Sequence, residues 1–119
     1  MYRIRFYKDR QGKRPVVEYL KNLRESKNER DKKQAEKIND YIQTLKLLGK
    51  AAGLPYVRHI DGELWELRPA RDRILFFSWI DNQIVLLHQF TKKTQKTPRS
   101  EIDKAMREIA QVKESGLDD

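Results

Sequence analysis

The sequence contains no cysteine, so disulfide bonds and thiolate metal ligands are excluded. Its two histidines, His59 and His88, lie far apart in the chain, and the acidic residues show no paired-ligand pattern. Glycine-rich phosphate loops, nucleophile elbows and HExxH motifs are also absent. We therefore expect neither a metal centre nor a cofactor.

Long apolar runs are missing as well, and none approaches the length of a membrane span. The N-terminus, MYRIRFYKDR, lacks the apolar segment of a signal peptide. We therefore expect a cytoplasmic protein without a membrane partner. The 119 residues suit one domain, 1–119, with a single hydrophobic core.

Acidic residues are the minority charge, with 18 Asp and Glu against 26 Lys and Arg, which gives a net charge of +8. This balance favours a polyanionic partner such as nucleic acid or an acidic protein. The alternative is a soluble protein whose basic surface is simply solvated.

Hydrophobic periodicity and turn residues predict an α+β fold in the order β-α-α-β-β-β-α. The connection 50–63 is irregular, with a short extended piece at 56–60. We expect a mainly antiparallel sheet whose helices pack on one face and leave a basic face open. The predicted strands cover 2–7, 64–68, 73–80 and 83–90, and the predicted helices cover about 15–25, 28–48 and 98–114.

Two turns set the register of the last three strands: a two-residue loop at Asp81-Asn82 and a four-residue loop at 69–72. Side chains alternate between the faces of a strand, so a one-residue slip would move half of one face to the other. The predicted facing pairs are Ile80 with Gln83, Leu75 with His88, Arg73 with Phe90, Arg68 with Arg73, and Glu66 with Leu75. The predicted core face carries Trp65, Leu67, Ile74, Phe76, Ser78, Ile80, Val85, Leu87 and Gln89. The predicted open face carries Leu64, Glu66, Arg68, Arg73, Leu75, Phe77, Trp79, Ile84, Leu86, His88 and Phe90.

Arg68 and Arg73 stand opposite each other in this register. Like charges placed directly opposite on a sheet are destabilising, so an anionic ligand would explain the arrangement. A phosphodiester fits, because guanidinium pairs with phosphate through two hydrogen bonds. The alternative is that Glu66 neutralises one arginine while solvent screens the other.

Other residues near this cluster are candidates with plainer alternatives. His88 could act as an acid or base, or be a structural strand histidine bonded to a neighbour. Phe90 is a candidate for stacking on a base. For Phe77 and Trp79 we expect instead a second small core under the last helix.

The loop after residue 90, TKKTQKTPRS, carries four cations and no acid. Its lysines could hold backbone phosphates, and one could serve as a general base; the alternative is a solubilising loop. Thr97 is expected to cap the last helix, with Pro98 in its first turn. The extended piece at 56–60 places Arg58 near the entrance of the strand meander. The four cations are Lys92, Lys93, Lys96 and Arg99.

The segments DGELWELRPARDRILFF, IVLLHQFTKKTQKTP and EIDKAMREI resemble the RelE/HigB superfamily of type II toxins, and most closely its phage Gp49-like branch. The resemblance covers essentially the whole chain, and the FTKKTQKTP block is its most specific part. It implies a small ribonuclease that cuts messenger RNA on the ribosome and arrests growth. It also implies inhibition by a helix-turn-helix, HigA-like antitoxin, with operator DNA bound only through the toxin–antitoxin complex.

The resemblance further implies that the RNA 2′-hydroxyl attacks the adjacent phosphorus and leaves a 2′,3′-cyclic phosphate. Many relatives use a C-terminal tyrosine or lysine as base, but no tyrosine follows Arg99 here, so His88 or a loop lysine must substitute. The alternative is a non-catalytic module that binds RNA, DNA or an acidic protein. The implied catalytic residues are Arg68, Arg73, His88 and Lys93, and the implied RNA-binding residues are Arg58, Phe90, Lys92, Lys96 and Arg99.

Overall fold

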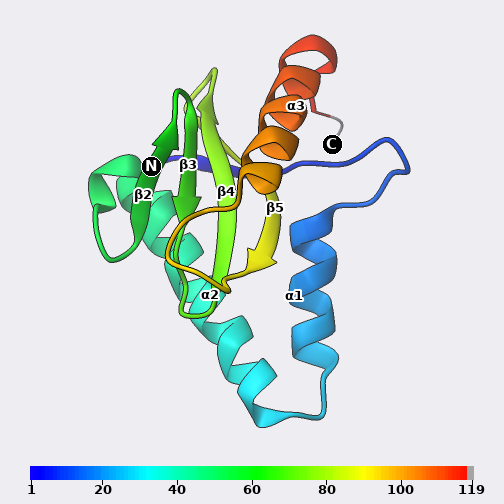
Figure 1. The fold of residues 1–119 in the computed structure, drawn as a ribbon, viewed down its shortest axis with the longest axis vertical. Helices are drawn as coiled ribbons and strands as arrows, with labels where there is room; N and C mark the ends of the chain where they lie inside the picture. The colour runs from blue at the N-terminus through cyan, green and yellow to red at the C-terminus, as the bar shows by residue number, and fades with distance from the viewer. Residues whose placement is uncertain (118–119) are drawn as a thin grey trace.

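The computed structural model describes residues 1–117 (Figure 1). Its five-stranded sheet has the order β1-β5-β4-β3-β2, with β1 parallel to β5 and all other neighbours antiparallel. None of the helices in this part of the chain combines the length and apolarity that crossing a bilayer requires. The strands are β1 (Arg3–Phe6), β2 (Val57–Asp61), β3 (Leu64–Leu67), β4 (Asp72–Trp79) and β5 (Gln83–Thr91). The helices are α1 (Pro15–Glu25), α2 (Glu29–Leu48), the 3-10 helix η1 (Gly49–Ala52) and α3 (Arg99–Ser115).

The predicted α+β class is confirmed, and one strand is added to the predicted order. The extended piece expected at 56–60 is strand β2, which pairs antiparallel with β3. Its sequence, VRHID, is short and half polar, so periodicity alone does not separate it from an irregular connection. Pairing with β3 stabilises it as an edge strand of the sheet.

Helices α1 and α2 cover one face of the sheet (Figure 1). Their apolar stripes pack on alternate residues of β4, such as Ile74 and Phe76, and both of these side chains are fully buried. This packing follows from the 3.6-residue spacing of the apolar positions of each helix. The helical contribution to this core consists of Val16, Leu20, Leu23, Ala35, Ile38, Ile42 and Leu45.

Helix α3 packs on the other face, against Leu75 and Phe77 of β4 (Figure 1). This corrects the expectation that all helices lie on one face. Leaving large apolar side chains such as these in water would be unfavourable, so the second face needs a cover of its own. The prediction of a small second core under the last helix is confirmed, with Phe77 fully buried and Trp79 packed at its margin. The open part of this face is therefore confined to its end near the β3–β4 turn.

A β-bulge in β5 divides the β4–β5 hairpin into two registers. The predicted pairs of Leu75 with His88 and Arg73 with Phe90 are confirmed, but the predicted pair of Ile80 with Gln83 is wrong. Gln83 pairs with Trp79 instead, and the bulge absorbs the extra residue.

The bulge exchanges the two faces of β5 on its hairpin side. Ile84 and Leu86, expected on the open face, belong to the core under α1 and α2, whereas Val85 and Leu87 face α3. Ile80, expected in the core, is 61% exposed. Beyond the bulge the predicted alternation resumes, which is why the register of Arg73 and His88 was predicted correctly.

Candidate active site

The antiparallel pairing gathers charged side chains at the end of the sheet near the β3–β4 turn. Arg58 of β2 pairs with Glu66 of β3. The β3–β4 ladder ends at the pair of Leu67 with Ile74, so Arg68 and Arg73 are the next residues along the two strands. Alternation puts both on the face that Glu66 occupies. We call Arg58, Glu66, Arg68 and Arg73 the arginine cluster.

Glu66 lies at the centre of the arginine cluster and is 1% exposed. Its Oε2 atom is 3.2 Å from Arg58 Nε, 3.4 Å from Arg68 Nε and 3.9 Å from Arg73 Nε. Its Oε1 atom accepts a hydrogen bond of 2.9 Å from the hydroxyl of Thr97. One carboxylate thus serves three guanidinium groups, which leaves the cluster with an excess of positive charge.

The three guanidinium groups differ in how they are held. The Arg73 side chain is 8% exposed, against 20% for Arg68 and 39% for Arg58. Arg73 Nη1 donates to the backbone carbonyls of Ala70 and Asp72, at 2.9 and 2.8 Å. Burial lowers the pKa of Arg73, and the neighbouring Arg68 charge lowers it further. Arg73 is therefore a fixed, largely desolvated cation beneath two more accessible ones.

A mismatch in hydrogen bonding also lies within the cluster. Arg68 Nε and Glu66 Oε2 are both buried, yet neither makes a hydrogen bond of good geometry. Buried charged groups without hydrogen bonds are unfavourable, so an anion that accepted bonds from these arginines would be stabilised. Phosphate oxygens have the charge and geometry to do this.

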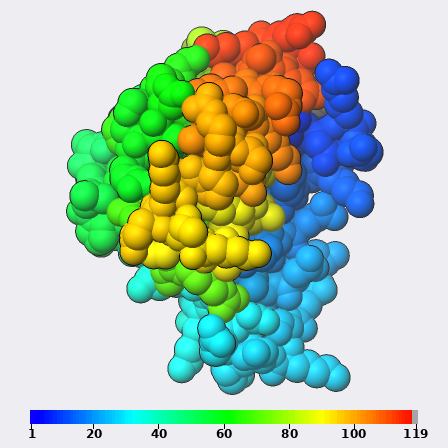
Figure 2. All heavy atoms as spheres, viewed as in Figure 1, coloured from blue at the N-terminus to red at the C-terminus, as the bar shows by residue number. Residues whose placement is uncertain are grey.

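The loop 92–98 is fastened beside the cluster at both ends. The backbone N–H of Lys92 donates to the carbonyl of Arg71 at 2.8 Å, and Thr97 bonds to Glu66. Between these points Lys93 and Lys96 are exposed. Figure 2 shows this segment, in yellow and orange, as a ridge between the green β2–β3 hairpin and the blue N-terminal part of the chain.

The Thr97 contact corrects the predicted helix cap. Pro98 occupies the cap position of α3, where no side chain supplies a capping hydrogen bond. The Thr97 hydroxyl is drawn instead to the buried Glu66, because a buried carboxylate needs donors more than an exposed helix end does. Arg99, at the start of α3, is exposed and pairs with Asp103 at 3.1 Å.

Phe90 lies opposite Arg73 in the β4–β5 ladder, as predicted. Its ring is half-buried and packs at the margin of the core under α3. One part of the ring therefore remains accessible beside the arginine cluster.

His88 lies on the same face of the sheet as Glu66, with Leu75 of β4 between the two in register. The His88 side chain is 2% exposed, and both ring nitrogens face carboxylates of α3. Nδ1 lies 2.5 Å from Glu108 and Nε2 lies 2.9 Å from Glu101. These contacts fasten α3 to the sheet and leave neither ring nitrogen free for a substrate. A sequence signal existed: Glu108 is the one acidic residue within the buried stripe of the helix.

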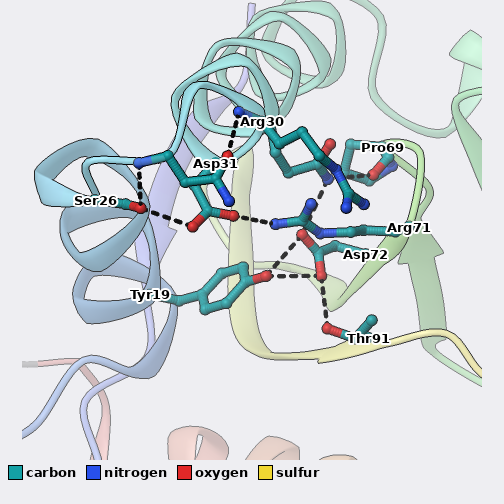
Figure 3. Close-up of polar contacts among 10 residues, drawn as sticks. Tyr19, Ser26, Arg30, Asp31, Pro69, Arg71, Asp72 and Thr91 are labelled. Carbon is teal, nitrogen blue, oxygen red and sulfur yellow. Dashed lines mark hydrogen bonds and ion pairs between the residues drawn. The ribbon is translucent and has the colours of Figure 1, made fainter.

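A second polar network lies on the opposite face of β4 and centres on Asp72, which is fully buried (Figure 3). Tyr19 of α1 donates to both carboxylate oxygens at 2.9 Å. Gln34 of α2 donates to Oδ2 at 2.9 Å, and Thr91 of β5 donates to Oδ1 at 3.1 Å. We call Tyr19, Gln34, Asp72 and Thr91 the aspartate network. Sequence reasoning missed it, because its members come from separate elements without local spacing.

Alkaline conditions are expected to weaken the aspartate network through Tyr19. Burial, followed by the hydrogen bond to Asp72, raises the pKa of Tyr19 above 10.0. The folded state thus holds the phenolic proton more tightly than the unfolded chain. The resulting stabilisation is complete below the unfolded pKa and is lost as the pH rises through the folded pKa.

Urea unfolding at about pH 9 and about pH 11 measures this effect. Wild type should lose more stability over this interval than the Tyr19→Phe variant. Burial also raises the pKa of Tyr7, so Tyr7→Phe serves as a matched comparison. Equal losses in wild type and Tyr19→Phe would contradict the expectation.

Among residues 1–117, no three His, Asp or Glu side chains converge in a way that could hold a metal ion.

Comparison with known proteins yields one family. The model of the family described as "Phage derived protein Gp49-like (DUF891)" matches residues 26–110, well over half of the chain. The matched range contains the whole arginine cluster and the loop 92–98. A search of curated proteins finds no significant match.

Proposed function

Because the chain belongs to the Gp49-like family of phage-derived proteins, a family of RelE/HigB-like toxins, we propose that it is the toxin of a type II toxin–antitoxin system and cleaves messenger RNA on the ribosome. The observation that carries this proposal is the arginine cluster, in which three guanidinium groups share one buried carboxylate. Such a site carries a net positive charge and is already partly desolvated. It suits a phosphodiester whose negative charge increases during reaction.

In the proposed reaction the ribose 2′-oxygen attacks the adjacent phosphorus. A 2′-O–P bond forms and the P–O5′ bond breaks, which yields a 2′,3′-cyclic phosphate and a 5′-hydroxyl. Arg68 and Arg73 orient the phosphate and stabilise the charge on its non-bridging oxygens. A base takes the 2′-hydroxyl proton, and an acid protonates the departing 5′-oxygen.

The flanking residues are proposed to hold the RNA strand on either side of this phosphate. Lys92, Lys96 and Arg99 would contact backbone phosphates, and such contacts make binding salt-dependent. Phe90 would stack on a base, and Arg58 would support a neighbouring phosphate. Lys92 and Lys96 lie in the loop 92–98, Phe90 lies near the end of β5 that leads into it, and Arg99 begins α3, which follows it.

Proton transfer is proposed for Lys93 or His88, and the geometry favours Lys93. Lys93 is exposed on a loop fastened at both ends beside the cluster. His88 has both nitrogens occupied and is shielded by α3.

Two variants separate these candidates. Lys93→Ala should lower the rate of cleavage by about 10²-fold or more without changing the melting temperature, as loss of a general base does. His88→Gln should lower the melting temperature, because the buried Glu108 loses its short hydrogen bond to the imidazole, but should retain cleavage per folded molecule. Lys104→Ala, an exposed lysine on α3, controls for charge. Full cleavage by Lys93→Ala together with loss of cleavage per folded molecule in His88→Gln would instead assign the base to His88.

The partner expected for a toxin of this class is a helix-turn-helix, HigA-like antitoxin. With a net charge of +8, the chain would attract an acidic inhibitor as well as RNA. We propose that operator DNA is bound only by the complex of the two proteins. A gel shift with operator DNA, with and without the antitoxin, tests this directly.

A second candidate function is a non-catalytic module that binds RNA, DNA or an acidic protein on the same basic surface. One observation favours it. Glu66 and His88 lie in one row with Arg58 across the sheet, and both are buried and already hydrogen-bonded, so neither side chain is free to act as a base. The module needs no base and would leave a transcript uncut.

Analysis of RNA ends distinguishes the two functions. Purified protein is incubated with a defined transcript, alone and loaded on ribosomes, and the ends of the fragments are identified. The proposed enzyme yields 2′,3′-cyclic phosphate and 5′-hydroxyl ends from the ribosome-loaded transcript. A transcript that binds the protein but remains intact in both conditions would favour the binding module.

A further inference from the structure

The β3–β4 turn that separates Arg68 from Arg73 has an unfavourable backbone conformation at Ala70. The Ala70 φ angle is +53°, and the backbone N–H of Asp72 donates to the carbonyl of Pro69 at 3.1 Å. A positive φ at the first central residue of such a turn is the pattern that favours glycine. For alanine this conformation costs free energy, so the surrounding structure has to enforce it.

Side chains from α1, α2 and β5 enforce the conformation of this turn. The aspartate network holds the Asp72 carboxylate with donors from these three elements. Gln34 also donates to the carbonyl of Pro69 at 2.8 Å, so one amide group holds both ends of the turn. Arg71, between them, pairs with Asp31 of α2 at 2.9 Å (Figure 3).

The same turn supplies the carbonyls that fix Arg73. The Nη1 atom of Arg73 donates to the carbonyls of Ala70 and Asp72. The direction of both carbonyls depends on the backbone angles from Ala70 to Asp72. A change in these angles would move the Arg73 guanidinium with respect to Glu66 and Arg68.

We propose that Asp72 is a positioning residue. Together with Tyr19 and Gln34 it holds the turn at Ala70 in its strained form. The backbone carbonyls of this turn then orient the Arg73 guanidinium toward the bound phosphate. This rests on the proposed function, because the phosphate is that of the RNA. Asp72 itself lies on the face of β4 opposite the arginine cluster and does not touch the substrate. Helices α1 and α2 thereby contribute to the active site from the far side of the sheet.

Asp72→Asn tests this proposal, because its amide group places donors against the Tyr19 and Gln34 donors. The variant should lower kcat for RNA cleavage by about 10- to 100-fold, as small displacements of a positioned group do, with KM changed by less than about twofold. Tyr19→Phe keeps the carboxylate and should show a smaller loss in the same direction. Asp40→Asn, which removes an exposed carboxylate of α2 outside the aspartate network and the turn, is the matched control and should stay within about twofold of wild type.

Rescue separates positioning from general loss of stability. Glycine adopts a positive φ without strain, so Ala70→Gly allows the turn to form without the aspartate network. The double variant Asp72→Asn/Ala70→Gly should therefore recover a substantial part of the lost kcat. A melting temperature that stays low while kcat recovers would exclude a purely structural explanation.

An NMR measurement makes the test independent of catalysis. The Arg73 Nε–Hε signal, assigned by its absence in Arg73→Lys, should shift or broaden in Asp72→Asn and return in the double variant. If wild type does not cleave RNA but this signal behaves as described, the proposed function fails and the positioning role stands. A folded Asp72→Asn variant with an unchanged Arg73 signal and unchanged kcat would overturn the positioning role.

Discussion

Replacing Arg73 by alanine is expected to lower RNA cleavage by about 10²- to 10³-fold, the effect of removing one preorganised group that stabilises transition-state charge. Arg73 is the most buried and most firmly held cation of the arginine cluster, with two backbone carbonyls as acceptors and Glu66 beside it. A desolvated charge interacts more strongly with a phosphate than an exposed one. Lys at this position would keep the charge but lose the planar, two-pronged geometry.

Three variants make this expectation specific. Arg73→Ala and Arg73→Lys are compared with Arg10→Ala, which removes one positive charge from an exposed position. Cleavage is measured per folded molecule, because the alanine variant leaves two turn carbonyls without their donor. Arg10→Ala should retain nearly full activity and Arg73→Lys should be strongly impaired. A folded Arg73→Ala variant with wild-type cleavage would remove Arg73 from the active site.

Replacing Glu66 by alanine is expected to destabilise the protein by about 3–5 kcal/mol, the cost of breaking a buried ion pair by removing one partner. Three guanidinium groups would then face one another without their shared carboxylate. The Thr97 hydroxyl would also lose its acceptor, which frees one end of the loop 92–98. The stability loss and the loosened loop should both appear in the same variant.

Inorganic phosphate should partly replace the missing carboxylate. We expect phosphate to raise the melting temperature of Glu66→Ala more than that of wild type, because the anion binds a cluster that has lost its own. Glu36→Ala removes an exposed carboxylate of α2 and serves as the matched control. Urea unfolding gives the free energies. A Glu66→Ala variant as stable as Glu36→Ala would show that the carboxylate does not hold the cluster together.

The arginine pair was predictable from sequence because its determinants are local. Strand alternation and a short turn suffice to place Arg68 and Arg73 beside each other and beside Glu66. The register of β4 and β5 at the end away from the hairpin loop was also predicted correctly. The prediction was off by one residue at the loop, and the bulge restores the predicted register before Leu75 and His88.

The remaining features depend on contacts between distant elements. The surroundings of His88 are set by the two carboxylates of α3, and a count along β5 does not report how that helix packs. Asp72 looks like an ordinary turn residue in the sequence, but its partners come from α1, α2 and β5. Thr97 has the spacing of a helix cap and bonds to Glu66 instead. The pattern of side chains along the sequence predicts an element and its faces. The side-chain contacts between distant elements are fixed only by how those elements pack.

The arginine cluster is proposed to cleave messenger RNA during translation. Mapping the 5′ ends of one transcript after brief induction of the protein tests it most directly. The transcript is examined with its start codon intact and with the start codon destroyed, for wild type and for Arg73→Ala. New 5′ ends that appear only with the intact start codon, and only with wild type, are the result we predict. Growth arrest by wild type without any new 5′ ends would contradict it.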